Sequence, residues 1–547
     1  MVITDLLERN AKLYRRDVAI VEISPSEKRD KVATWREASL VEEALPNQPY
    51  RREMTWQEFD RRANRVANLI LSRGYKKGDK IGILLYNCIE WLPIYFGILK
   101  SGCLAVPMNF RYASDEIVYC IDLADVEALF FGAEFIERID PVIDQLGKVK
   151  NFWFVGPEGE CPEYAERLKT IAGYFSSTVP PVELTEDDYA AIYFSSGTTG
   201  FPKAILHKHR ALINSCRTEQ AHHGQTRDDV FLCIPPLYHT GAKMHWFGSL
   251  LAGSKAIILK GIKPEWIFRT ISEEKCTIVW LLVPWAQDIL DEIDAGRLKV
   301  EDYMLDQWRL MHIGAQPVPH SLIEKWKEIF PNHQYDTNYG LSESIGPGCV
   351  HLGVENIHKV GAIGVPGYLW ETKVIDEKGN PVPQGEVGEL AVKGPGVMIE
   401  YYKNPEATAE TLHDGWLWTG DMAKVDEDGF IWLVDRKKDV IITGGENLYP
   451  VQIEDFLRTN NKIKDVAVIG IADKRLGEIA AAIVELKEGV TMDENEFNEF
   501  CMELPRYKRP KVVIFADVPR NPTGKIEKPL LRKRYGGDRL VEAQTKQ

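Results

Sequence analysis

Apolar and polar residues follow helical and then strand-like spacing early in the chain. From Gln57 to Gly74 the apolar side chains recur every three or four positions, which predicts an amphipathic helix that ends at the glycine. Lys80–Leu85 is a short, mainly apolar run that predicts a buried strand, and Trp91–Leu99 predicts a second helix. Strands that alternate with helices predict a parallel sheet with helices on both faces.

The same alternation recurs later and then changes character. Further strands are predicted at Ala128–Phe131, Val230–Ile234, Ala256–Leu259 and Ile278–Val283. Between Gly361 and Gly396 short strands and turns follow each other closely, which is typical of an antiparallel sheet or a β-barrel. The residues after Asp435 form a compact α/β stretch that is long enough to fold on its own. Residues 24–53 are charged and contain proline, so we expect a surface excursion there.

Composition and charge limit the classes of function. The chain has 547 residues, 44% hydrophobic and 27% charged, which is ordinary for a soluble protein of two or more domains. Its formal net charge of −14 disfavours nonspecific binding to nucleic acid or to an anionic membrane. Nine cysteines without a C-x-x-C pair fit free thiols in a reducing compartment. The first residues are typical of a helix rather than a signal peptide, and no apolar run reaches about 18 residues, so we expect a cytoplasmic protein without a transmembrane segment.

A loop of glycines and hydroxyl residues, closed by a lysine, carries the first chemical signal. Glycines let the backbone approach a bulky anion, hydroxyls can hydrogen-bond phosphate oxygens, and the lysine adds a positive charge. The loop residues are Ser195, Ser196, Gly197, Thr198, Thr199, Gly200 and Lys203. The spacing is not that of a Walker A loop, and the segment taken alone is also compatible with a flexible linker.

Four further motifs follow in order: Tyr339–Glu343, Trp418–Asp421, Asp435–Asp439 and Pro522–Lys525. Together with the loop, and over essentially the whole chain, they resemble the adenylate-forming superfamily of acyl-CoA synthetases, peptide-synthetase adenylation domains and beetle luciferases. The resemblance is strongest to the AMP-forming acyl-CoA synthetases. It implies an α/β fold: a large N-terminal domain of two αβ-layered sheets plus a β-barrel subdomain, and a small mobile C-terminal α+β domain. The implied boundary separates residues 1–435, which bind ATP and the acyl group, from residues 436–547, a lid that rotates near Lys438.

The resemblance also implies roles for individual residues. Glu343 and the hydroxyl of Ser196 are expected to hold Mg²⁺, because a hard cation prefers oxygen ligands and bridges substrate phosphates. Lys525 is expected to neutralise the acyl carboxylate and the α-phosphate as the adenylate forms. The candidate catalytic residues are Lys525, His239, Lys203 and Glu343. The candidate nucleotide-binding residues outside the loop are Gly314, Ala315, Tyr339, Gly340, Ser342, Glu343, Asp421, Arg436 and Lys525. Among them, Tyr339 is expected to stack on adenine, and Asp421 with Arg436 to bind the ribose hydroxyls. Taken singly, each of these residues would be explained as an ordinary cap, turn, core or surface residue.

The implied reaction consumes ATP and coenzyme A together with a small carboxylic acid. The lid is expected to withdraw Lys525 after adenylation and to bring Gly444 and Gly445 to a tunnel for the pantetheine arm, where glycine permits close passage. ATP, Mg²⁺, coenzyme A and the acid are therefore the expected ligands. Nucleic acid is not expected, and a homodimer is left open.

The acyl pocket is expected to take an acid larger than acetate. Gly340 stands where acetyl-CoA synthetases have a tryptophan that shortens the pocket. The candidate acyl-binding residues are His239, Met244, Val283, Ile313 and Gly340, with Trp246, Phe247, Trp280 and His312 as further wall candidates. These walls suggest a medium-chain, branched or ring-containing acid. No acidic residue is evident among them, which argues against an amino-acid substrate, whose ammonium group would need one.

Three alternatives stay open beside a CoA ligase. The first is an adenylation enzyme that loads the phosphopantetheine of a carrier protein, and the second is an adenylate-forming oxidase of the luciferase kind. The third, a binding protein without catalysis, is disfavoured by the intact Lys203, Glu343, Asp421 and Lys525. The pairs His207/His209 and His222/His223 have no evident third ligand, so a transition-metal site is not expected.

Overall fold

The computed structural model describes residues 1–27, 50–195, 202–314, 318–351, 358–443, 446–520 and 526–536. The described chain divides into two compact units, which are treated separately below. Unit 1 comprises Met1–Glu371 and Val392–Leu417, and unit 2 comprises Thr372–Ala391 and Trp418–Gln547. The predicted boundary after Asp435 falls inside unit 2 and stays a prediction.

Unit 1 contains two large sheets, both mainly parallel. One has the strand order β16-β15-β14-β13-β12-β10-β11-β1-β2 and the other β19-β9-β8-β4-β3-β5-β6-β7. The strands of the first are β1 (Val18–Ile23), β2 (Arg51–Thr55), β10 (Val230–Cys233), β11 (Lys255–Leu259), β12 (Ile278–Leu282), β13 (Leu310–Gly314), β14 (Gln334–Leu341), β15 (Gly346–His351) and β16 (Val365–Pro366). The strands of the second are β3 (Lys80–Leu84), β4 (Leu104–Pro107), β5 (Val126–Gly132), β6 (Asn151–Val155), β7 (Ala165–Arg167), β8 (Tyr189–Phe194), β9 (Ala204–Lys208) and β19 (Glu400–Tyr401).

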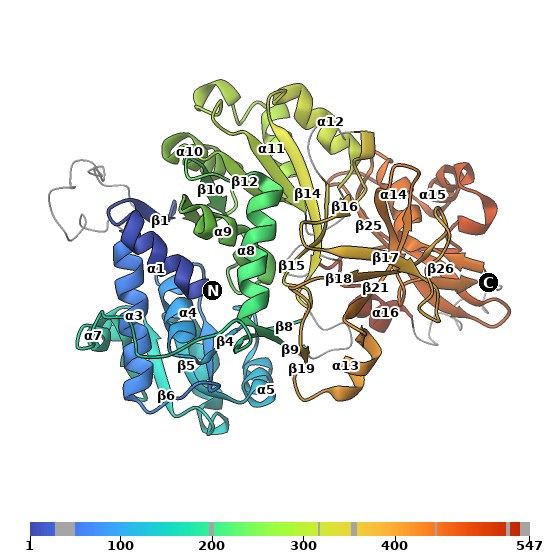
Figure 1. The fold of residues 1–547 in the computed structure, drawn as a ribbon. Coiled ribbons are helices and arrows are strands. Elements are labelled where there is room, and N and C mark those ends of the chain that lie inside the picture. Colours follow the sequence, from blue (N-terminus) through green and yellow to red (C-terminus); the bar gives the residue numbers. More distant parts are fainter. Residues whose placement is uncertain are drawn as a thin grey trace. The chain divides into compact units, whose positions relative to one another are not determined.

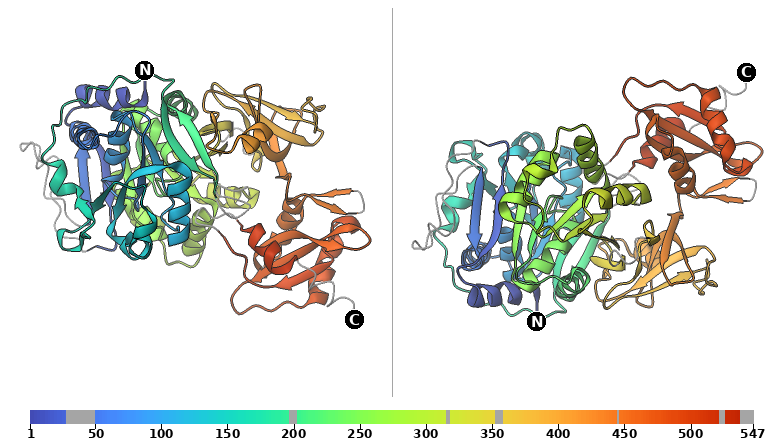
Figure 2. Two further views of the ribbon diagram at one scale, coloured as in Figure 1. Left: turned by 90° about the horizontal axis from the view of Figure 1, so that it is seen from below. Right: turned by 90° about the horizontal axis from the view of Figure 1, so that it is seen from above.

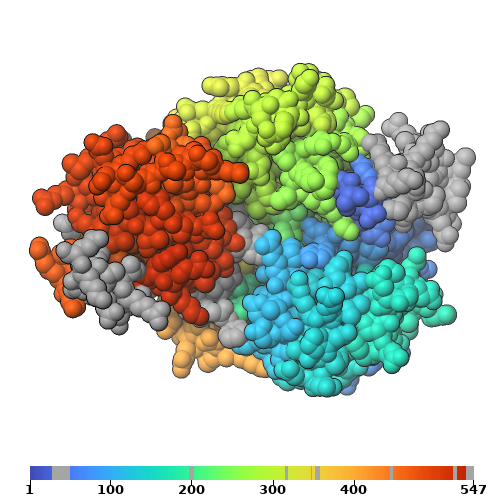
Figure 3. Space-filling view, turned by 180° about the vertical axis from the view of Figure 1, so that it is seen from behind, coloured from blue at the N-terminus to red at the C-terminus, as the bar shows by residue number. Residues whose placement is uncertain are grey.

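Helices cover both faces of both sheets in unit 1. The α-helices are α1 (Ile3–Leu13), α3 (Trp56–Ser72), α4 (Trp91–Lys100), α5 (Ser114–Ala124), α6 (Ile136–Ile139), α7 (Leu168–Ala172), α8 (His209–His223), α9 (Thr240–Ala252), α10 (Pro264–Glu274), α11 (Val283–Asp294), α12 (His320–Ile329) and α13 (Pro405–Thr411). The part with β3–β6 (blue to cyan) and the part with β10–β14 (green to yellow) lie side by side (Figures 1 and 3). Seen from below, the part with β3–β6 is nearer the viewer, and seen from above, the part with β10–β14 is nearer (Figure 2).

Three apolar cores explain this layering. The first includes residues of α1, α3, α4, α8 and α9 together with the inner faces of both sheets. The second joins α10, α11 and α12 to the outer face of the nine-stranded sheet, and the third joins α5 to the outer face of the eight-stranded sheet. Because parallel strands here are buried on both faces, their sequences are nearly continuous apolar runs, as predicted.

Unit 2 contains two smaller sheets. The first holds β17 (Glu371–Ile375), β18 (Gly388–Lys393), β21 (Trp416–Val425) and β22 (Ile431–Arg436), and the unit boundary crosses the ends of β17, β18 and β21. The hairpin strand β20 (Leu412–His413) pairs with the unit 1 end of β21. The second holds β23 (Ile441–Thr443), β24 (Glu446–Leu448), β25 (Ile463–Asp473), β26 (Gly477–Leu486) and β27 (Val512–Phe515). Its helices are α14 (Pro450–Arg458), α15 (Glu494–Phe500) and α16 (Lys528–Tyr535).

The expected fold class is confirmed, and one local expectation is corrected. The described chain is α/β with several sheets and a C-terminal α+β region. However, the end of the charged segment at 24–53 is not a surface excursion, because Arg51–Thr55 forms β2 and pairs antiparallel with β1. Arg52 makes ion pairs of 2.6 Å with Glu22 and with Glu90, which attach this edge strand to its neighbours. Residues 28–49 lie outside the described residues.

Candidate functional site

Four neighbouring parallel strands of unit 1 direct their carboxyl ends to one edge of the nine-stranded sheet. They lie in the order β14-β13-β12-β10. His239 follows β10, Val283 follows β12, Gly314 ends β13, and Tyr339–Glu343 covers the end of β14 and the turn after it. Ligands of open parallel sheets bind outside the carboxyl ends of the strands. Strand order therefore gathers candidate residues that lie far apart in the sequence.

The base of the predicted phosphate loop is closed by two reciprocal hydrogen bonds. The Ser195 backbone N–H donates to the carbonyl of Lys203, and the Lys203 N–H donates to the Ser195 hydroxyl, both at 3.0 Å. These bonds extend the antiparallel pair of β8 and β9 by one rung. Ser196, Gly197, Thr198, Thr199 and Gly200 lie outside the described residues.

Tyr401 connects Lys203 with Glu343 and was missed by sequence reasoning. The Lys203 ammonium lies 4.6 Å from the centre of the Tyr401 ring, a cation–π contact. The Tyr401 hydroxyl donates to Glu343 Oε1 at 2.8 Å. Burial and the adjacent Glu343 carboxylate raise the Tyr401 pKa, so the phenol stays a donor. No motif singles out this tyrosine, because only β19 pairing with β9 brings it beside the loop.

Tyr401→Phe is expected to weaken Mg²⁺ binding at Glu343 about tenfold, because loss of a partner behind a metal ligand typically costs about 10- to 100-fold. The ring that faces Lys203 is retained. The Mg²⁺ concentration that gives half-maximal AMP formation measures this effect. Tyr402→Phe, which removes a hydroxyl bound instead to Asp125, is the matched control. If Tyr401→Phe and Tyr402→Phe require the same Mg²⁺ concentration, Tyr401 does not support Mg²⁺ binding at Glu343.

The His239 side chain caps the start of α9. Its Nδ1 atom accepts the Gly241 N–H at 3.2 Å, so the ring proton resides on Nε2. The loop before it is anchored by Lys243, a second residue that sequence reasoning missed. The buried Lys243 side-chain nitrogen, whose pKa burial lowers well below its usual value, donates to the carbonyls of Leu237 and Tyr238 at 2.8 and 3.0 Å. A lysine inside a mainly apolar helix was the available signal, since burying an unpaired charge is costly.

Ser342 contacts both the strand that follows the phosphate loop and the residue that follows His239. Its carbonyl contacts Nε2 of His207 at 2.9 Å, and its hydroxyl lies 3.3 Å from the hydroxyl of Thr240, the residue after His239. Burial lowers the pKa of His207 to about 4, so this histidine is neutral and donates to the carbonyl. The phosphate-loop strand, the His239 loop and the Glu343 turn therefore meet around Ser342.

A methyl group would fit without a clash at the buried Gly314 of the predicted adenine site. A Cβ atom on Gly314 would lie 3.5 Å from the Thr337 hydroxyl and 4.0 Å from His312 Nε2, so nothing crowds this position. Tyr339 is buried and Gly340 is exposed at the end of β14. Ala315 lies outside the described residues.

The candidate acyl-binding residues separate into two groups. Val283 and Ile313 belong to the core on the outer face of the sheet, and Trp246 and Phe247 belong to the core between the sheets. Trp280 also belongs to the core between the sheets, and it lies beside the His239 loop, because a Cβ atom on Gly241 would come within 3.0 Å of its ring. The buried Met244 lies in α9, two residues before Trp246. Their roles stay predictions.

The predicted ribose-binding pair lies in unit 2. Asp421 and Arg436 are direct cross-strand partners on β21 and β22, with Arg436 Nε 3.4 Å from Asp421 Oδ1. Lys438 lies in the turn after β22, where a hinge is predicted. Burial raises the pKa of the neighbouring Asp435 to about 6, and its carboxylate accepts the N–H groups of Arg436 and Val451. Gly444, Gly445 and Lys525 lie outside the described residues.

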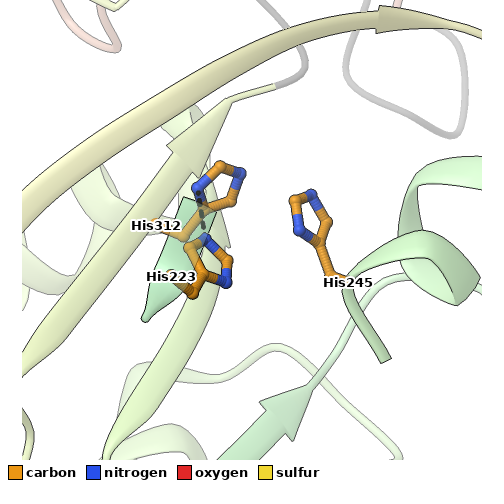
Figure 4. Close-up of side chains that lie close together, drawn as sticks. All are labelled: His223, His245 and His312. Atoms are coloured by element: carbon orange, nitrogen blue, oxygen red, sulfur yellow. Dashed lines mark hydrogen bonds between the residues drawn. The ribbon is translucent and has the colours of Figure 1, made fainter. Parts of the chain in front are cut away.

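The expectation that the His222/His223 pair lacks a further ligand is wrong, whereas that for His207/His209 stays a prediction. His245 of α9 and His312 of β13 lie close to His223, the last residue of α8 (Figure 4). We call these three residues the histidine cluster. Asp336 of β14 is buried against it, so an acidic residue does adjoin the wall candidate His312. The argument against an amino-acid substrate assumed that no acidic residue lies near the pocket walls, so it no longer holds.

Comparison with protein families decides which kind of protein has this site. The model described as "AMP-binding enzyme" matches residues 24–402, and that described as "AMP-binding enzyme C-terminal domain" matches residues 452–525. The chain belongs to the AMP-binding enzyme family. The resemblance to adenylate-forming enzymes is thereby confirmed.

Known relatives of this AMP-binding enzyme match almost end to end. The chain is 33% identical to the long-chain-fatty-acid–CoA ligase FadD13 of Mycobacterium tuberculosis, over 88% of this chain and 93% of that protein. It is 31% identical to a feruloyl-CoA synthase of Amycolatopsis, over 88% and 94%. Among solved structures, ATP-bound MatB from Rhodopseudomonas palustris superposes with a TM-score of 0.83 at 26% identity, covering 98% of this chain and 99% of that one.

Two further expectations about this AMP-binding enzyme can be compared with the structure. All nine cysteines are free, in agreement with the absence of a disulfide framework. Within the described ranges, no helix combines the length and apolar character that crossing a membrane requires.

Proposed function

We propose that this enzyme is an AMP-forming ligase that joins a carboxylic acid larger than acetate to coenzyme A. One observation carries the proposal most directly: Tyr401 contacts both Lys203 at the base of the phosphate loop and Glu343 after β14. A cation and a carboxylate fixed on either side of one ring suit a triphosphate and the divalent ion that accompanies it. The family membership and the CoA-ligase names of its relatives support the same reaction.

The proposed reaction has two halves in one site. First, a carboxylate oxygen of the acid attacks the α-phosphorus of ATP, forming an acyl-adenylate and breaking the bond to pyrophosphate. Then the CoA thiol, losing its proton, attacks the acyl carbon, and AMP leaves with the electron pair of the broken C–O bond. Both halves place negative charge on oxygen, so fixed cations and donors are the main contribution of the protein.

Mg²⁺ fits the Glu343 site. The Glu343 carboxylate offers hard oxygen ligands, and the Tyr401 hydroxyl orients it. Ser196 is the proposed second protein ligand. When bound, the ion would bridge substrate phosphates and neutralise their charge.

The acid is proposed to be medium-chain, branched or ring-containing. Gly340 has no side chain to shorten a pocket, and Trp280 provides an aromatic surface beside the His239 loop. The feruloyl and long-chain fatty acids named for relatives are both larger than acetate. A cytoplasmic location and homodimer formation remain proposals from the sequence.

Gly340→Trp is expected to shift preference toward shorter acids. An indole would occupy the volume of several methylenes, and each methylene contributes about 0.8 kcal/mol, or roughly fourfold, to binding. The ratio of kcat/KM for a long and a short acid measures the shift. Gly340→Ala, which adds one methyl group, is the graded control. An unchanged ranking of acids in Gly340→Trp would show that Gly340 does not border the acyl pocket.

A panel of acids tests the proposed function itself. AMP release is measured for each acid with free CoA, with a phosphopantetheinylated carrier protein, and with neither thiol. Thioester formation that requires free CoA supports the ligase. Turnover only on the carrier protein would favour the alternative adenylation enzyme, and oxygen-dependent product formation without a thiol would favour the oxidase.

A further inference from the structure

The histidine cluster is buried where four elements of unit 1 meet. His223 ends α8, His245 lies in α9 and His312 in β13, while Glu219 of α8 and Asp336 of β14 contact them from behind. Exposed fractions are 4% for His223, 1% for His245 and 0% for His312, so bulk water does not solvate these rings. Such a polar group inside a protein requires partners.

One nitrogen from each of the three histidines lies within 4.8 Å of those of the other two. His223 Nε2 and His312 Nδ1 are 3.3 Å apart, and the His245 ring faces them from the neighbouring helix (Figure 4). Nitrogens that share a tetrahedral ion at about 2.0 Å are separated by roughly 3.3 Å. For one ion to contact all three, the nitrogens would have to approach from within 4.8 Å of one another to about this separation.

The two carboxylates occupy the positions that support metal ligands. Glu219 Oε1 accepts His245 Nδ1 at 2.7 Å and lies 2.7 Å from His223 Nδ1. Asp336 contacts His312 Nδ1 and lies 3.3 Å from His223 Nε2. A carboxylate on one ring nitrogen fixes the tautomer and leaves the other nitrogen as a ligand, as in carboxylate–histidine–zinc arrangements.

Three buried atoms of this group have no hydrogen-bond partner among the described residues: His312 Nε2, Glu219 Oε2 and His223 Nδ1, although the last lies 2.7 Å from Glu219 Oε1. A buried polar atom without a partner is unfavourable unless a ligand completes its environment.

We propose that the histidine cluster binds one Zn²⁺ ion, with His223, His245 and His312 as ligands and with Glu219 and Asp336 as the carboxylates that support them. Zn²⁺ takes imidazole and carboxylate ligands in tetrahedral geometry, and the site is closed to water like structural zinc sites. Because the ligands come from α8, α9 and β13, the ion would join helices between the sheets to the nine-stranded sheet. It would also fix Trp280, whose ring lies 4.4 Å from His245.

Metal content of the full-length protein tests the proposal without reference to catalysis. Protein freed of metal with a chelator is dialysed against Zn²⁺, and bound zinc is counted per chain by mass spectrometry. One ion per chain is expected. At Zn²⁺ about a hundredfold above its Kd, the Tm of unit 1 should rise by about 3 °C, since only the folded cluster binds. The Co²⁺-loaded protein should show the visible absorption of a tetrahedral ion.

Two variants and a control locate the site. His312→Ala removes a ligand, and His245→Asn keeps an amide donor near Glu219 but lacks the distal nitrogen. Each is expected to lower Zn²⁺ affinity at least about a hundredfold. His333→Ala, which alters a buried histidine stacked on Phe330 instead, should bind zinc like the parent.

Two results would overturn the proposal. If the folded parent protein retains no stoichiometric Zn²⁺ and its Tm does not rise when Zn²⁺ is added, the cluster is only a hydrogen-bonded network. If His245→Asn and the parent bind Zn²⁺ equally, the ion lies elsewhere. Neither result bears on the ligase activity, which is measured separately by AMP release.

Discussion

Lys525→Ala is expected to reduce adenylate formation by about three orders of magnitude while thioester formation from supplied acyl-AMP and CoA stays within about tenfold of the parent. Lys525 is proposed to act only while the carboxylate and the α-phosphate combine, so its loss does not affect the second transition state. Pyrophosphate exchange measures the first half-reaction, and thioester formation from synthetic acyl-AMP measures the second.

Gly445→Leu is the reciprocal variant of the same experiment. A leucine side chain is expected to obstruct the proposed pantetheine tunnel and leave Lys203 and Glu343 unchanged. Pyrophosphate exchange should survive while thioester formation fails. If both variants slow the two halves equally, the proposed rotation near Lys438 does not separate the half-reactions.

Glu343→Gln is expected to lower adenylate formation by about 10²- to 10³-fold, the usual cost of one electrostatic contact to a transition state. Glutamine keeps an oxygen that accepts the Tyr401 hydroxyl, so the local packing is preserved and only the charge is lost. Single-turnover formation of acyl-AMP at saturating Mg²⁺ measures the effect.

The control for Glu343→Gln is Glu400→Gln, a carboxamide change on the neighbouring strand β19. It should retain the parental rate. A Glu343→Gln rate within twofold of the parent, with normal thermal unfolding, would exclude Glu343 as the Mg²⁺ ligand.

Helices and strands were predictable from the sequence where a single spacing of apolar residues continues along the whole element. The helix expected from Gln57 to Gly74 is α3, and the glycine follows its end with a φ of 86°, a conformation that glycine tolerates best. β2 was not predictable, because Arg51–Thr55 carries three charged residues and depends on ion pairs to Glu22 and Glu90 rather than on an apolar pattern.

The candidate site was predictable only where its residues adjoin in sequence. Ser195, Lys203 and Glu343 belong to local motifs, whereas Tyr401 reaches them through strand pairing over a long sequence separation. The histidine cluster escaped prediction for the same reason: the register of β13 with β14 sets His312 beside Asp336, and packing of α8 on α9 supplies the rest.

The pairing of β1 with β2 has a practical consequence for protein engineering. Ile23 and Arg51 are register partners, and the Ser24 N–H donates to the Tyr50 carbonyl at 2.9 Å, so the chain leaves and re-enters the sheet at adjacent points. Loop-closure entropy grows slowly with length. This pair of anchors is therefore a natural graft point, where a reporter domain or an affinity module with neighbouring termini can replace residues 28–49 while the sheet hydrogen bonds around it are kept.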